Sequence, residues 1–206
     1  MKVLIAVPCM DMVHTPFFKS CLALKHVGEV EFTISYGSLI YDARNSIAKK
    51  AIDEGFDRML WLDSDMTFEP DIMQRLNARI DEGCEFVTGL YVKRKGKIGP
   101  VIYKTCGMLP NDKGVMVPTA VAYDDYPKDQ LFQIEGCGFG GVMMTVDLMK
   151  RVREKLGLPF YPSSGFGEDF SFCLRARQLG AKLWCDSSVK LGHVGYYEFN
   201  EKDIER

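Results

Sequence analysis

The stretch that most constrains the fold is residues 58–65, Arg-Met-Leu-Trp-Leu-Asp-Ser-Asp, where a short apolar run stops at two carboxylates. Residues 59–62 are apolar without alternation and are bounded by polar residues, which is typical of a strand buried on both faces. Period-two geometry at its end would point Asp63 and Asp65 the same way, so that two hard oxygen donors share one divalent cation. We therefore expect an α/β sheet with a site at its edge.

The Asp-x-Asp spacing is weak evidence by itself, because a chain with this many aspartates contains about one such pair by chance. The alternative is a solvated turn between a strand and a helix. Position favours the site, because ligands of open α/β sheets bind beyond the carboxyl ends of the strands. We expect Asp63 and Asp65 to bind a metal or a nucleotide there.

Length and charge narrow the class of protein. A chain of 206 residues with 47% hydrophobic content suits one well-filled core, so we expect a single domain over residues 1–206. A net charge of −2 leaves no field to attract nucleic acid, which we do not expect as a partner. The basic cluster at residues 93–97, Lys-Arg-Lys-Gly-Lys, is expected to be an exposed loop.

The cysteines and the hydropathy pattern indicate a cytoplasmic protein. Seven Cys, an odd number without a Cys-x-x-Cys pair, are typical of reduced core residues rather than of a disulfide framework or a zinc site. No apolar run approaches the length of a membrane span. We expect a soluble protein without a transmembrane segment.

The first half alternates between strand and helix patterns. We expect strands over residues 2–7, 30–35, 59–62 and 86–92, and helices over 15–25, 43–54 and 70–82. Pro8 ends the first strand, Asp42 caps the second helix, and Gly55 stops it. This order predicts an α/β fold with a mostly parallel central sheet.

The second half has a different character. Short β-like pieces at 101–105, 115–122 and 131–134 are separated by turn residues, which predicts hairpins, a long loop over 123–130 and a smaller antiparallel or mixed part. Residues 136–141 match Gly-x-Gly-x-x-Gly, but no acid follows at 158–162, as a dinucleotide fingerprint requires. These glycines either let the backbone approach a ligand or pack a tight bend.

Two helix starts and one late histidine carry the remaining candidates. Arg44 and Asn45 lie in a first helical turn, where a guanidinium could meet a phosphate or carboxylate, although an ordinary surface Arg is the alternative. Glu168 and Asp169 open a helix that runs to residue 179, where the dipole keeps a carboxylate ionised and usable as a base, although plain capping is the alternative. A strand over 181–185 follows, and His193, between glycines, would alone be a loop residue.

Taken in order, these motifs resemble the GT-A glycosyltransferases, especially the family 2 type of nucleotide-sugar enzymes. The resemblance runs from about residue 3 to residue 195. It rests on the strand ending at Pro8, Ala43-Arg44-Asn45, Leu62-Asp63-Ser64-Asp65, the Gly-rich turn from Gly138, Gly167-Glu168-Asp169, and His193.

The resemblance implies a role for each motif. Asp63, Asp65 and His193 would form the site for Mn²⁺ or Mg²⁺, with Asp65 the direct ligand. The donor would contact the nucleotide-binding set, Pro8, Arg44, Asn45, Asp63, Asp65, Arg94, Gly140 and Gly141, where the last two leave room for the sugar. Asp169 would be the catalytic base and Glu168 its acceptor-binding partner.

The implied activity is an inverting, metal-dependent transfer of a sugar from a UDP- or GDP-sugar to a hydroxyl of a glycan, lipid-linked or protein acceptor. Residues 1–92 would bind the donor and residues 93–206 the acceptor. Two alternatives stay open: a nucleotidyltransferase, although residues 8–15 lack a Gly-rich loop bearing Lys or Arg, and a non-catalytic nucleotide-sugar-binding module.

Overall fold

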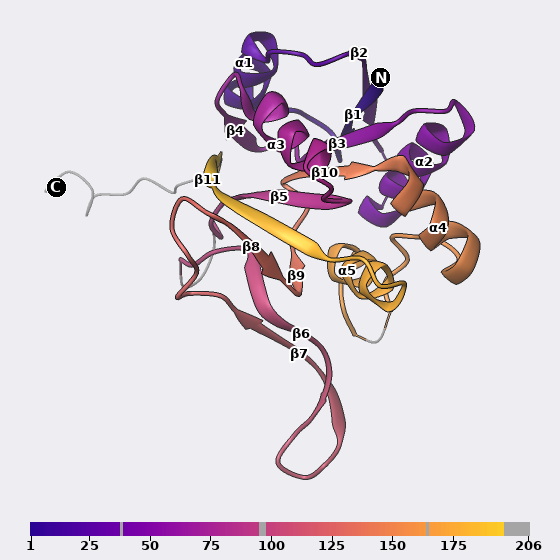
Figure 1. The fold of residues 1–206 in the computed structure, drawn as a ribbon, viewed down its shortest axis with the longest axis vertical. Helices are drawn as coiled ribbons and strands as arrows, with labels where there is room; N and C mark the ends of the chain where they lie inside the picture. Colours follow the sequence, from indigo (N-terminus) through magenta and orange to yellow (C-terminus); the bar gives the residue numbers. More distant parts are fainter. Residues whose placement is uncertain (38, 95–97, 164, 196–206) are drawn as a thin grey trace, which may run out of the picture.

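The computed structural model describes residues 1–37, 39–94, 98–163 and 165–195, and Figure 1 shows its elements. The first half contains β1 (Lys2–Pro8), α1 (Thr15–Ala23), β2 (Glu29–Ser35), α2 (Ile40–Asp53), β3 (Arg58–Leu62), β4 (Met66–Phe68), α3 (Ile72–Asp81) and β5 (Phe86–Leu90). The second half contains β6 (Ile102–Pro110), β7 (Met116–Ala122), β8 (Leu131–Ile134), β9 (Gly136–Cys137), β10 (Gly141–Thr145), α4 (Val146–Leu156), α5 (Glu168–Gln178) and β11 (Leu183–His193).

The central sheet has eight strands in the order β2-β1-β3-β10-β5-β11-β4, and β8 also pairs with β11. Strands β2, β1 and β3 are parallel neighbours, and so are β5 and β11. Strand β10 lies antiparallel between β3 and β5, so those two strands run in the same direction. Five strands therefore point one way, which confirms a mostly parallel central sheet.

Helices cover both faces of this sheet because its central strands are apolar on both sides. In β3, Met59 and Trp61 face one core cluster, whereas Leu60 and Leu62 face the other. Helices α2, α4 and α5 pack on the first face, and α1 and α3 on the second. The strand predicted at 59–62 is thus buried on both faces, as expected.

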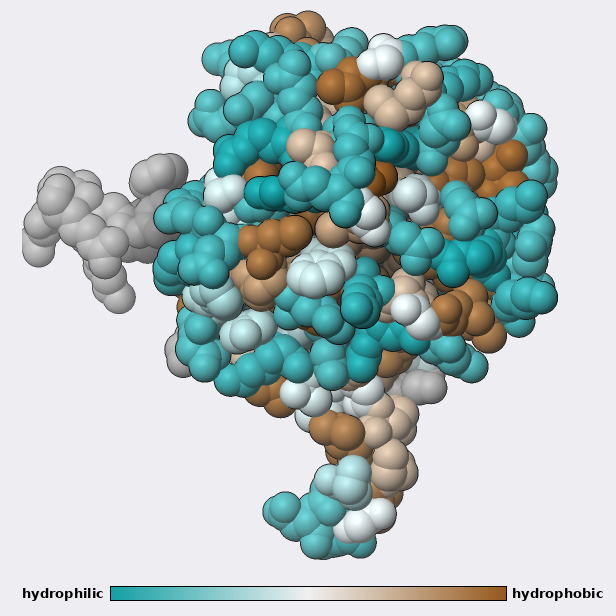
Figure 2. All heavy atoms as spheres, in the orientation of Figure 1, coloured by the Kyte–Doolittle hydropathy of each residue, from teal (hydrophilic) through white to brown (hydrophobic). Residues whose placement is uncertain are grey.

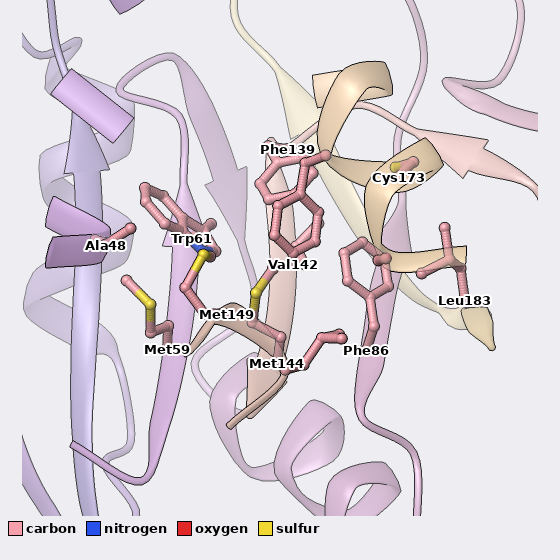
Figure 3. Packing of buried hydrophobic residues seen from close by; sticks show 14 of the residues in the cluster. Ala48, Met59, Trp61, Phe86, Phe139, Val142, Met144, Met149, Cys173 and Leu183 are labelled. Atoms are coloured by element: carbon pink, nitrogen blue, oxygen red, sulfur yellow. The ribbon is translucent and has the colours of Figure 1, made fainter. Parts of the chain in front are cut away.

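Aromatic rings fill the first cluster beneath the carboxyl end of β3. Figure 3 shows Trp61, Phe139 and Phe86 packed together on this face of the sheet. The ring centroids of Phe139 and Phe160 lie 5.1 Å apart with the planes nearly perpendicular, an arrangement that aromatic quadrupoles favour. This cluster makes a rigid floor for the polar residues above it.

A second, antiparallel sheet has the order β7-β6-β9 and confirms the smaller antiparallel part. Its β6–β7 hairpin projects from the body of the molecule (Figure 1). Figure 2 shows apolar side chains along this hairpin and hydrophilic ones at its tip. The hairpin turns at Asn111, whose side chain accepts the amide hydrogens of Lys113 and Val115.

Several predicted boundaries were wrong. Helix α2 begins at Ile40, with Leu39 as its N-cap, so Asp42 lies in the first turn and does not cap the helix. The strand predicted at 181–185 continues to His193, because its second part pairs with β4. Helix α4 was not predicted, although Thr145 accepts the amide hydrogen of Leu148 as a typical N-cap.

All seven cysteines are free thiols, as expected, and every one except the half-buried Cys21 is buried. Within the described ranges, no helix is both long and apolar enough to cross a membrane. Of the basic cluster at 93–97, residues 95–97 lie outside the described part of the chain.

Candidate functional site

A polar cleft lies where the parallel strands β1 and β3 end side by side. It has a volume of about 370 Å³. It is lined by Pro8, Met10, Ile40, Arg44, Asp63, Ser64, Asp65, Arg94, Glu168 and His193. The structure therefore brings seven of the predicted site residues, from widely separated parts of the sequence, to the edge of the sheet where ligands of α/β proteins bind.

Asp63 and Asp65 both line the cleft, but they lie beyond the end of strand β3 rather than within it. Strand β3 ends at Leu62, and the chain turns so that the amide of Met66 donates to the carbonyl oxygen of Asp63 at 3.1 Å. A turn interrupts the alternation of side chains that a strand would impose. The two carboxylates consequently have different partners.

Asp65 is held between a guanidinium and an imidazole. Its Oδ2 atom lies 2.5 Å from Nη1 of Arg94 and 3.6 Å from Nε2 of His193. Burial acts to raise the pKa of Asp65, but the interactions with His193 and Arg94 outweigh it and hold this pKa below its usual value. The interaction with Asp65 raises the pKa of His193.

The contacts of His193 fit a metal ligand. Strand β11 places this residue opposite Met66 of β4, so it is a strand terminus rather than the loop residue that the sequence suggested. Its Nδ1 atom lies 2.9 Å from the carbonyl oxygen of Val92. When Nδ1 donates its hydrogen to that carbonyl, Nε2 of the neutral ring would be able to bind a cation shared with Asp65, the arrangement that orients metal-binding histidines.

The candidate metal ligands differ from the expected set of Asp63, Asp65 and His193. Asp63 Oδ1 lies 2.8 Å from Nη2 of Arg44, whereas Asp65 pairs with Arg94 and His193. Among the described residues, no group of three His, Cys, Asp or Glu side chains is arranged to hold a metal ion. The donors that fit a cation here are thus one carboxylate and one imidazole, which leaves coordination positions for ligand oxygens and water.

Arg44 lies in the interior beneath the cleft. It is 2% exposed, and its Nε atom lies 3.3 Å from Oε1 of Glu168, so one guanidinium joins the end of β3 to the start of α5. Burial acts to lower the pKa of Arg44, but the neighbouring Asp63 and Glu168 outweigh it, and the pKa is raised overall. The alternative of an ordinary surface Arg is therefore wrong.

Aromatic rings and one unpaired atom complete the surroundings of Arg44. The guanidinium carbon lies 5.5, 5.2 and 5.9 Å from the ring centroids of Trp61, Phe139 and Phe160. Such contacts stabilise a desolvated cation. The buried Nη1 atom has no hydrogen-bond partner, which leaves both of its N–H groups unused.

Glu168 and Asp169 lie in the first turn of α5, as predicted, but neither is the N-cap, which is Gly167. Glu168 lines the cleft, whereas Asp169 is not among the lining residues. Burial, reinforced by the charge of Glu168, raises the pKa of Asp169 to about 6. The helix dipole therefore does not dominate this carboxyl, although it is still mostly ionised at pH 7.

Four predicted residues are not part of the lining of the cleft: Asp169, described above, and Asn45, Gly140 and Gly141. Asn45 faces away, and its Oδ1 atom accepts the amide hydrogen of Phe160 at 3.0 Å. Gly140 and Gly141 are buried. A Cβ on Gly140 would lie 2.9 Å from Tyr91, and one on Gly141 would lie 2.5 Å from Leu191. These glycines give room to neighbouring side chains, which corrects the interpretation that they leave room for a sugar.

Tyr91 is a buried residue that contacts the site residue His193 and was not predicted from the sequence. Its hydroxyl accepts the amide hydrogen of Gly140 at 3.3 Å, and its ring meets the ring of His193 edge to face at 5.6 Å. Burial raises the pKa of Tyr91 well above its usual value. The available signal was its position directly after β5, two residues before Lys93.

The comparisons with known proteins concern the fold. No protein-family model matches the sequence, and no curated protein matches it. The solved structure of A197 from STIV is similar, with a TM-score of 0.67 and 20% identity over 95% of this chain and 87% of A197.

GalNAc-T7, solved with UDP, GalNAc and Mn²⁺, is similar with a TM-score of 0.61 and 11% identity. The match covers 96% of this chain and 44% of GalNAc-T7, so the chain spans less than half the length of that protein. Sequence identities of 20% and 11% show a similarity of fold only. They confirm a GT-A-like fold, and membership of family 2 stays a prediction.

Proposed function

We propose that this protein is an inverting, metal-dependent glycosyltransferase that uses a nucleotide-sugar donor. The observation that carries the proposal is the cleft, where Asp63, Asp65, Arg94, Glu168 and His193 converge at the carboxyl ends of parallel strands. Support comes from the GT-A-like fold, which it shares with a protein solved with UDP, GalNAc and Mn²⁺. Fold alone does not determine activity, so the site must support the chemistry.

The cation would be Mn²⁺ or Mg²⁺, held by Asp65 and His193. A mixed oxygen and nitrogen donor set suits Mn²⁺ better than Ca²⁺. When bound, the cation supplies electrostatic stabilisation of the charge that grows on the departing nucleoside diphosphate. Asp63 would act through Arg44, which it holds in place.

The donor would lie over the edge of the sheet formed by residues 1–92, beside Pro8 and Arg94. Arg94 also donates to the carbonyl oxygen of Val194 at 2.9 Å, so it is already placed at the mouth of the cleft. Its guanidinium matches a phosphate oxygen pair in shape and charge. Arg44 and Asn45 serve this half as positioning residues, since both are engaged within the protein.

The acceptor would enter from the side formed by residues 93–206, with Glu168 binding it. Asp169 would take the proton of the acceptor hydroxyl while that oxygen attacks the anomeric carbon on the face opposite the leaving diphosphate. A pKa of about 6 suits this role, because a general base works best when its pKa lies near the operating pH. The donor would be a UDP- or GDP-sugar, and the acceptor a glycan, a lipid-linked sugar or a protein in the cytoplasm.

The test is to incubate the protein with UDP- and GDP-sugars and Mn²⁺ and to measure the release of the free nucleoside diphosphate. We expect release with one donor, faster when acceptor sugars are added, and a product of inverted anomeric configuration by NMR. Binding of a nucleotide sugar without any release would instead support the alternative of a non-catalytic binding module. Release of inorganic diphosphate from a nucleoside triphosphate and a sugar phosphate would support a nucleotidyltransferase.

A further inference from the structure

Strand β2 is the edge of the central sheet, and its outer backbone groups are unpaired among the described residues. The amide of Glu29 donates to Met1, and the carbonyl of Ser35 accepts from Cys9, so the odd-numbered residues direct their backbone groups toward β1. Successive residues of a strand alternate in this respect. Val30, Phe32 and Ile34 therefore direct their amide and carbonyl groups outward.

The side chains next to this edge are apolar on one face. Phe32 and Ile34 line a groove with residues of α1 and its flanks, and they are exposed together with Phe18 and Leu22 of α1. The lining is almost entirely apolar and includes Val13, Phe17, Cys21 and Leu24. An exposed apolar patch beside an unpaired strand edge marks a surface for association.

The opposite face of β2 is polar. Glu31 lies there and forms an ion pair with Lys50 of α2 at 2.7 Å. Strand β2 thus has one polar face and one apolar face, and the apolar face is partly exposed to solvent. The apolar face lies on the α1 side of the sheet, away from the helix that carries Arg44.

We propose that two copies of this chain dimerise through β2, paired antiparallel about a two-fold axis at Phe32. This register opposes Phe32 to Phe32 and Val30 to Ile34, and it pairs all seven residues of the strand. Because these residues direct their backbone groups outward, the pairing adds about six hydrogen bonds between the copies. The two α1 helices then lie on the same side of a continuous sheet and cover the apolar groove.

Charge selects this register over its neighbours. With the axis at Phe32, Glu31 of one copy lies opposite Thr33 of the other, and Glu29 lies opposite Ser35. An axis at Val30 or at Glu31 would oppose two glutamates, and like charges directly opposite each other destabilise a strand pair. An axis at Thr33 avoids this clash but pairs only five residues of β2.

The same features argue against a lipid surface as the occupant of this patch. The outward amides and carbonyls of β2 would remain unpaired in an apolar medium, which is costly, and open sheet edges do not occur in the hydrocarbon region. A second copy satisfies the backbone groups and covers the apolar side chains at once.

The first test is the mass in solution, measured by light scattering across a concentration series. We expect twice the chain mass of 23.3 kDa for the natural sequence. Phe32→Lys should weaken dimerisation at least ~10-fold, because it opposes two ammonium groups at the axis. Leu158→Lys, which places the same charge on an exposed leucine outside β2 and α1, should leave the dimer intact. A monomer at all concentrations, or equal loss in both variants, would overturn the proposal.

The second test is oxidative cross-linking, which reads the register directly. Residues opposite each other in a hydrogen-bonded antiparallel pair have Cα atoms about 5.5 Å apart, within the span of a disulfide. Phe32→Cys should therefore form a covalent dimer, whereas Thr33→Cys and the unmodified protein should not. Cross-linking through Thr33→Cys alone would overturn the proposed axis. Binding of the monomeric protein to phospholipid vesicles, lost in Phe18→Lys, would replace the dimer with a membrane-docking surface.

Discussion

Replacing Arg44 by Met should destabilise the whole protein rather than the site alone. The change keeps an apolar side chain on Trp61, Phe139 and Phe160 but removes the cation that lies between Asp63 and Glu168. Removing one partner of a buried ion pair costs about 3–5 kcal/mol, because it leaves uncompensated charge behind.

The expected magnitude lies at the lower end of that range. The side chains of Asp63 and Glu168 are 31% and 17% exposed, so water partly solvates the carboxylates that Arg44→Met leaves unpaired. A loss of about 3 kcal/mol lowers the melting temperature by about 6–12 °C in a chain of this size. Calorimetry or circular dichroism at pH 7 measures it.

The matched control is Arg151→Met. Arg151 forms ion pairs with Glu85 and Asp147 at the surface, where removal of a pair costs about 0–1 kcal/mol. A double variant, Arg44→Met with Glu168→Gln, should regain part of the stability, because one of the stranded charges is gone. If Arg44→Met melts within about 2 °C of the unmodified protein, Arg44 is not the internal clamp that the structure indicates.

Three further outcomes follow from the site. Asp169→Asn should lower sugar transfer by ~10² or more without lowering the melting temperature at pH 7.5, because Asn also accepts the amide hydrogen of Phe170, but it is no base. Transfer at a near-normal rate would assign Asp169 to structure alone. The rate of the unmodified enzyme should fall about tenfold per pH unit below pH 6, since the folded-state pKa of Asp169 is about 6 and the base must be ionised, whereas a rate that is constant down to pH 5 would exclude it. Protonation of Asp169 should also stabilise the fold as the pH falls from 7 to 4, because the folded state binds this proton more tightly than the unfolded chain does. In Asp169→Asn, the free energy of unfolding should no longer show this increase as the pH falls.

Much of the framework could be predicted from local sequence patterns. Strands β1 and β3 are continuous apolar runs, and Pro8 and Asp63 end them, so their position and the edge where they finish were readable. The first turn of α5 was also readable, because two acids follow a glycine there. Local patterns were sufficient for features that depend only on residues close together in the sequence.

The orientation of the site residues could not be predicted, because long-range contacts set it. Asp63 and Asp65 lie in the turn from Asp63 to Met66, and strand β4, which follows it, pairs with the distant strand β11. Strand β11 itself contains Ser187, Ser188 and Lys190, which hide a strand pattern, and its pairing with β5 shifts between Asp186 and Lys190. No local sequence pattern predicts that His193 lies close to Asp65.

The burial of Arg44 had no local signal either. A guanidinium in the first turn of a helix is usually solvated, and only the aromatic floor from β3, the Gly-rich turn and Phe160 encloses it. The sequence allowed two explanations for the glycines at 140 and 141. Either a ligand or a tight bend could explain them, and contacts with Tyr91 and Leu191 decide for packing.

The most direct test of the proposed function is calorimetric titration of UDP and GDP into the protein with Mn²⁺ and then with excess chelator. The matched variant is Asp65→Asn, which keeps the shape of the side chain but removes the charge that would hold the cation. We expect binding of one nucleotide with Mn²⁺, and its loss both in chelator and in Asp65→Asn. Equal affinity for the nucleotide in all three conditions would contradict the account, because the cleft would then bind its ligand without the cation.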